Sequence, residues 1–216
     1  FFSFFFLFSM NKFKYKTSFA CKINPLVSDD TDKYLSLASK KNLAQFIPKN
    51  IDFSRKPDFL GFSGEAFFGN RLNRNGDGVK AEEAISLAKS VPFSFVDLNH
   101  KRSDCFGVLV NASFIEFGTD KILTEDEVRK TKSPFTVVVG GVLWKPVNPK
   151  LVSAIEASNN PSSEYKDTFF ISWELMFSDM ELVVMEANKY NFEDGKIISD
   201  PKEIEEIEAR YKIDGI

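Results

Sequence analysis

His100 is the only histidine in this chain of 216 residues and is therefore its first candidate for a general acid or base near neutral pH. Imidazole is the side chain whose ordinary pKa suits a general base at that pH. His100 ends a strand-like run over residues 93–100 and precedes a second apolar run over residues 106–115. A lone histidine at a strand end is more often structural. Its function therefore depends on whether a nucleophile elsewhere in the chain meets it.

Ser172 is the nucleophile candidate, because it lies in the middle of a strand-like run over residues 168–177. Alternation along that run puts large apolar residues on one face, which must be core, and Ser172 on the other. A serine becomes a nucleophile when a base accepts its proton, and a rigid strand aims the hydroxyl. The plainer interpretation is a small residue on a half-buried sheet. Ser172 and His100 are the nucleophile–base combination that needs no metal.

A third group would orient the imidazole, and two acidic residues are candidates. Asp77 lies in the turn Asn75-Gly76-Asp77-Gly78, where a fixed backbone would aim its carboxylate, although a turn-forming aspartate is an equally good interpretation. Glu174 shares a face with Ser172, roughly 7 Å along the strand, and is the substitute. Asp97 is discounted, because a straight strand places it on the face opposite to His100.

Composition and charge exclude several other classes of function. A net charge of −3 argues against a general nucleic-acid binder, which needs a basic surface. Two cysteines and one histidine are too few for a disulfide framework or a structural zinc site, and a reducing cytoplasm is the expected compartment. The chain has no glycine-rich phosphate loop between a strand and a helix. We therefore expect no cofactor and no metal.

The first ten residues are almost wholly apolar and are treated separately. The run is far shorter than the roughly 20 residues that span a bilayer, and it lacks the basic stretch of a signal peptide. We expect residues 1–9 to be translated sequence upstream of a start at Met10, with a truncated membrane or export segment as the alternative. Residues 10–216 then form a single domain with one core.

The spacing of apolar residues, together with the positions of capping residues, prolines and glycines, predicts a mixture of strands and short helices. Residues 10–35 suit a short exposed strand, and Thr124 with Glu127 forms a capping box. The expected helices are 34–47 (ended by Pro48), a segment beginning near Val79, 124–132, 149–157 and a final helix after Asp200-Pro201. The expected strands are 59–68, 93–100, 106–115, 135–144, 168–177 and 181–187. This order predicts an α+β fold whose mostly antiparallel sheet is closed or curled into a barrel.

Four short motifs in this order resemble the prohead (capsid maturation) serine proteases of tailed phages, over about residues 35–200. They are Asn73-Arg74-Asn75-Gly76-Asp77, then Phe95-Val96-Asp97-Leu98-Asn99-His100, then Gly107-Val108-Leu109, and finally Ile171-Ser172-Trp173-Glu174. The resemblance implies a fold like herpesvirus assemblin, a small β-barrel surrounded by helices. It implies His100 as base and Ser172 as nucleophile.

The same resemblance implies a biological setting. The family protease acts inside the prohead, within the host cytoplasm, and cleaves scaffold and capsid precursor proteins and often itself. Its third catalytic member is acidic or histidine, so here Asp77 or its substitute Glu174 must serve, or the site is a dyad. Large-phage relatives continue beyond the position of Ile216, so further residues are expected. The alternative function is a catalytically inert head scaffold module of the same fold. Neither nucleic acid nor membrane is an expected partner, and a homo-oligomer is left open.

Overall fold

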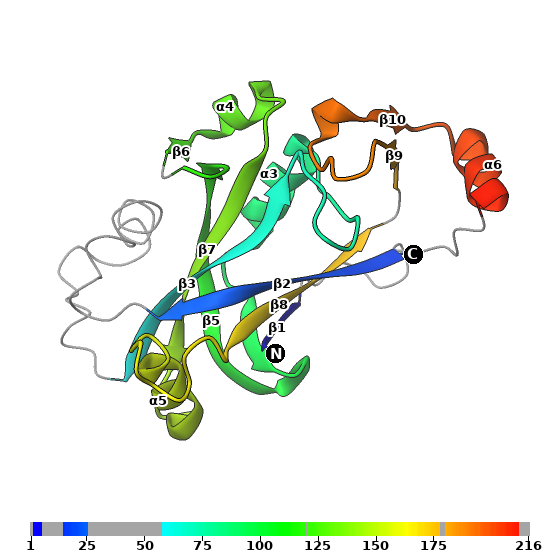
Figure 1. Cartoon of the computed structure of the whole chain (residues 1–216). Coiled ribbons are helices and arrows are strands. Elements are labelled where there is room, and N and C mark those ends of the chain that lie inside the picture. Colours follow the sequence, from blue (N-terminus) through cyan, green and yellow to red (C-terminus); the bar gives the residue numbers. More distant parts are fainter. Residues whose placement is uncertain (1, 6–14, 26–57, 120, 178–179, 212–216) are drawn as a thin grey trace.

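The computed structural model describes residues 2–5, 15–25, 58–119, 121–177 and 180–211 (Figure 1). The expected helix over 34–47 lies outside these residues. The helices are α3 (Ala81–Ser90), α4 (Glu125–Lys130), α5 (Pro149–Ala157), the 3-10 turn η3 (Phe192–Asp194) and α6 (Pro201–Tyr211). The strands are β1 (Phe2–Phe5), β2 (Tyr15–Pro25), β3 (Phe59–Gly69), β4 (Phe95–Leu98), β5 (Lys101–Glu116), β6 (Ile122–Leu123), β7 (Phe135–Trp144), β8 (Phe170–Phe177), β9 (Leu182–Val184) and β10 (Lys196–Ile198).

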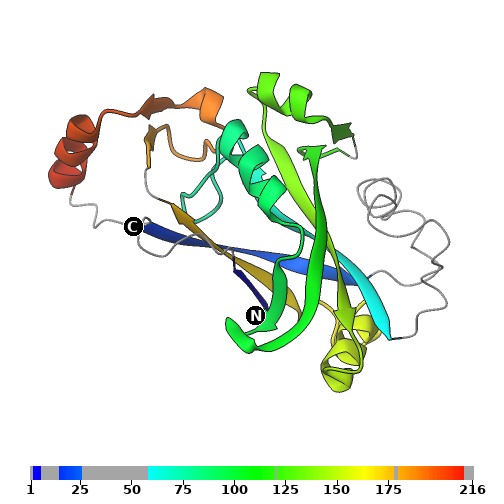
Figure 2. The same cartoon turned by 180° about the vertical axis from the view of Figure 1, so that it is seen from behind.

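One curled sheet organises the described part of the chain. Its strand order is β4-β1-β8-β2-β3-β7-β5-β6, and β4 also pairs with β5, so the ladder returns on itself. All of its pairings are antiparallel except that of β1 with β8. Figures 1 and 2 show the long β5 curving around one side of this sheet, with α3 on the same side. The predicted α+β class with a curled, mostly antiparallel sheet is confirmed.

The amino-terminal region differs from expectation in two ways. Residues 10–35 were predicted to hold a short exposed strand, but β2 runs over 11 residues and lies between β8 and β3. The alternating lysines that suggested exposure begin outside the strand, whereas Phe19 and Ile23 further along it are buried. Residues 1–9 were set aside from the fold, yet Phe2–Phe5 form β1 between β4 and β8.

Alternation along β8 sets the core as the sequence predicts. Ile171, Trp173 and Leu175 are buried, and so is Phe19, the register partner of Trp173 on β2. Burying each such side chain contributes about 1.5–3 kcal/mol relative to leaving it in water. On α3, the predicted stripe of Ala84, Ile85 and Ala88 is also buried. These faces fix which residues of β8 are left to point away from the core.

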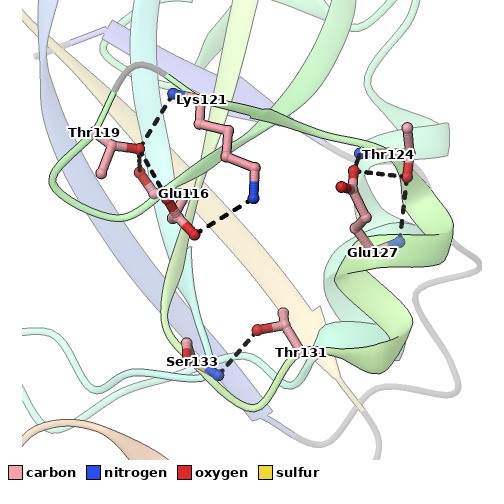
Figure 3. A network of polar contacts seen from close by, with 7 residues as sticks. All are labelled: Glu116, Thr119, Lys121, Thr124, Glu127, Thr131 and Ser133. Atoms are coloured by element: carbon pink, nitrogen blue, oxygen red, sulfur yellow. Dashed lines mark hydrogen bonds and ion pairs between the residues drawn. The ribbon is translucent and has the colours of Figure 1, made fainter.

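The capping box predicted from the sequence is present at the start of α4 (Figure 3). The Glu127 amide donates to Thr124 Oγ1 at 3.2 Å, and the Thr124 amide donates to Glu127 Oε2 at 2.8 Å. Both helix-terminal N–H groups are thereby satisfied. The carboxylate accepts these bonds best when ionised, which lowers the pKa of Glu127. The box explains why so short a helix begins at a defined residue.

Arg71 joins the segment that follows β9 to the main sheet. Its guanidinium carbon lies 4.4 Å from the ring centroid of Phe117 and 5.3 Å from that of Tyr190. Its Nη1 donates to Asn191 Oδ1 at 3.1 Å. The planar guanidinium can stack on rings and donate in its own plane at once, which an ammonium cannot. Arg71 thus connects the loop after β3, the loop after β5 and the segment after β9.

Replacing Arg71 tests this connection. Arg71→Lys keeps the charge but loses the stacked plane, and we expect it to lower the free energy of unfolding by about 1–2 kcal/mol. Arg74→Lys, in the exposed part of the same loop, is the matched control and should change stability by less than about 0.5 kcal/mol. Urea unfolding of the purified chain measures both. Equal stability of the two variants would show that the ring contacts contribute nothing.

Candidate active site

The turn between β4 and β5 holds His100. Leu98 pairs with Lys101, so Asn99 and His100 are the two central residues of the hairpin. Both have positive φ, 55° and 62° respectively, as a type I′ turn requires. Asn-Gly is the preferred pair in such turns, because glycine adopts this region without steric cost. A histidine at the second position therefore carries a backbone cost, and the imidazole is directed by the turn rather than by a straight strand.

The imidazole of His100 meets a carboxylate from a distant strand. His100 Nδ1 lies 3.2 Å from Glu174 Oε1, and Glu174 belongs to β8. The Glu174 side chain is 8% exposed and the imidazole is 30% exposed. A carboxylate withdrawn from water is costly unless a donor or positive charge faces it. The contact therefore stabilises the carboxylate and restrains the ring together.

Ser172 precedes Glu174 by two residues on the same strand. Strand alternation puts the two side chains on one face, opposite to Ile171 and Trp173, as predicted. Ser172 is 7% exposed. In a serine hydrolase the acid faces one ring nitrogen of the histidine and the nucleophile faces the other. The structure thus brings His100 to the face of β8 that carries both Ser172 and its neighbouring acid.

Asp77 lies in the turn that the sequence predicts. The side chain of Asn73 accepts hydrogen bonds from the amides of Asn75 and Asp77, at 2.8 Å and 3.0 Å, and Gly76 has a φ of 87°. Neighbouring backbone bonds tie the turn to the segment 190–192. The backbone at Asp77 is fixed in the manner expected. The carboxylate found against His100, however, is that of Glu174.

Asp97 is the residue that sequence reasoning placed wrongly. It is 1% exposed, and both it and Ser172 are register partners of Ser3 in β1. Residues opposite one another in a ladder share a face, so Asp97 lies on the same face as Ser172, two strands away. The register of β4 with β5 shifts on both sides of Asp97, and the chain then turns sharply at Asn99. The assumption of a straight strand through His100 failed for these reasons.

The site offers side chains for proton transfer and nucleophilic attack. Among the described residues, no group of three or more His, Cys, Asp or Glu side chains is arranged to hold a metal ion. No helix in the described part of the chain is both long and apolar enough to cross a membrane. The chain matches no protein-family model, and comparisons with curated proteins and with solved structures find no match.

The turn at Asn99 gives a test of how His100 is held. Asn99→Gly keeps access to positive φ, and we expect the imidazole proton signals of His100 to stay where they are in the unmodified chain. Asn99→Val places a β-branched residue in that region at a cost of about 1–2 kcal/mol and should shift those signals. Because the chain has one histidine, proton NMR resolves a single imidazole. Identical spectra for both variants would contradict the role of the turn.

Proposed function

We propose that the chain is a serine endopeptidase in which Ser172 is the nucleophile, His100 the general base and Glu174 the group that orients the imidazole. The observation that carries this proposal is the contact of His100 Nδ1 with the buried Glu174 carboxylate at 3.2 Å, beside a serine on the same strand face. A nucleophile, a base and a group that orients the base form one well-known arrangement for nucleophilic hydrolysis without a metal. Hydrogen bonds between catalytic groups are often longer in a free enzyme than in its substrate complex.

The reaction would proceed in two steps. Ser172 Oγ attacks the carbonyl carbon of the scissile peptide while His100 Nε2 takes the hydroxyl proton, which then passes to the leaving amine. Water then attacks the resulting acyl-serine and loses a proton to His100 Nε2, which returns that proton to Ser172 Oγ as the carboxyl product leaves. Glu174 holds Nδ1–H throughout, so that Nε2 faces the serine and the imidazolium is stabilised. Backbone N–H groups would stabilise the oxyanion in both steps.

The substrate proposal rests on the resemblance to tailed-phage prohead proteases. The motif order from Asn73 to Glu174 and the curled, mostly antiparallel sheet both accord with it. We propose that the chain folds as an assemblin-like barrel and cleaves scaffold and capsid precursor proteins, and itself, inside the prohead. A catalytically inert scaffold module of the same fold is the alternative, and it differs from the protease in lacking a reactive serine.

Removing the hydroxyl of Ser172 is the direct test. Ser172→Ala should abolish self-cleavage, cleavage of scaffold protein and labelling by a fluorophosphonate, with a rate loss of at least about 10³-fold. Ser63→Ala on β3 removes another buried strand serine and is the matched control, with labelling unchanged. Gel-based labelling and thermal melting are measured together. A folded Ser172→Ala chain that is processed or labelled normally rules out this nucleophile, and an unlabelled native chain favours the inert module.

The identity of the third member is tested by removing each candidate charge. Glu174→Gln keeps the side-chain shape but loses the charge beside His100 and should reduce the labelling rate by about 10²–10⁴-fold. Asp77→Asn removes the other candidate charge, in a turn held by Asn73, and we expect less than about a threefold effect. Labelling rates at neutral pH compare them directly. A larger loss in Asp77→Asn would assign the orienting role to Asp77 instead.

A further inference from the structure

The position of β1 in the sheet is unusual. It lies between β4 and β8, antiparallel to the first and parallel to the second, whereas every other pairing of this sheet is antiparallel. Its register with β4 extends over Phe2 and Ser3 only, while β2 follows β8 from Tyr15 to Lys22. Parallel pairing is slightly less stable per residue than antiparallel pairing. Of the two strands that pair with β8, β1 therefore has the shorter and intrinsically less stable ladder.

The place held by β1 adjoins the proposed nucleophile. Ser3 is opposite Ser172 in the ladder, so the backbone in this position passes about 4.8 Å from that of β8 at the level of the serine. The other edge of β8 is paired with β2 along Tyr15–Lys22. Ser172 is 7% exposed, so a polypeptide substrate reaches its hydroxyl only if a neighbour moves. Among the strands that flank Ser172, β1 has the shortest ladder.

We propose that the position between β4 and β8 is a binding site for an extended peptide and that β1 occupies it as an internal, substrate-like strand. Without β1, two facing strand edges about 10 Å apart would remain, which is the space of one added strand. An incoming peptide would then gain backbone hydrogen bonds on both sides, as in β-strand addition. This inference rests on the proposed function, because it assigns to the site of Ser172 the way in which its substrate binds.

The neighbours of β1 also indicate which peptides fit. The position of Phe2 is level with Leu98, which packs against the core, and with Ile171, which is buried in it. The next position is level with Asp97 and Ser172, which share the opposite face. The register therefore favours an apolar residue followed by a small polar one. Residues 2 and 3 of the chain itself, Phe-Ser, meet this rule.

A reversible covalent lock on β1 tests the proposal in the full chain. Phe2→Cys with Leu98→Cys places two thiols at directly opposite positions of an antiparallel pair, in a background with Cys21→Ser and Cys105→Ser. Leu182→Cys with Ile198→Cys, which locks β9 to β10 in the same background, is the matched control. Each protein is compared oxidised and reduced, for fluorophosphonate labelling and for binding of a fluorescent Phe-Ser-Phe-Phe peptide with two lysines at each end.

Oxidation of the β1 lock should abolish peptide binding and slow labelling at least tenfold, and reduction should restore both. The control lock should change neither, and the His100 proton signal should show that oxidation leaves the imidazole in place. Equal peptide binding in the oxidised and reduced forms overturns the proposed strand site. The site is also overturned if the reduced protein reacts with the fluorophosphonate but does not bind the peptide. Lock-dependent binding without labelling in either form upholds the site and refutes the serine hydrolase.

Discussion

A carboxylate withdrawn from water on β8 and an imidazole on a tight turn face each other across the sheet, and this contact organises the molecule's candidate chemistry. Glu174 comes from the late part of the chain and His100 from its middle, so the contact forms only once the sheet has curled. Each partner, taken by itself, lowers the stability of the folded chain. The acid loses hydration, and the histidine adopts positive φ where glycine would fit better. The contact places the imidazole 3.2 Å from the carboxylate, so each group has a polar partner.

Cost of this kind is more typical of functional sites than of structural ones. A turn selected for stability alone would place glycine after Asn99, and a strand selected for stability alone would not bury Glu174. One face of β8 buries the polar side chains of Ser172 and Glu174, whereas the other face buries the apolar side chains of Ile171, Trp173 and Leu175. The contrast between the two faces of one strand supports a chemical role for the polar one.

Much of the fold was predictable, because its strands and helices follow local rules. Alternation predicted the buried face of β8, the stripe on α3 followed its 3.6-residue period, and the capping box fixed the start of α4. The predictions that failed depended on neighbours far along the chain. β2 has charged residues at its start, yet it lies inside the sheet because β8 and β3 pair with both of its edges. Residues 1–9 are expected to be upstream sequence and enter no fold prediction, whereas Phe2–Phe5 form a strand whose pairing depends on two distant edges.

The amino-acid sequence alone determined the kinds of side chain available: one imidazole, a strand serine, and an acid two residues beyond it on the same face. It determined these because residue type and strand period are local properties. Which acid contacts His100, and on which face Asp97 lies, was decided only by tertiary structure. Register shifts in β4, two successive residues with positive φ, and the curl that carries β8 toward the hairpin turn all arise from pairing between remote segments. No local pattern encodes them, because the energy of a ladder belongs to both of its strands.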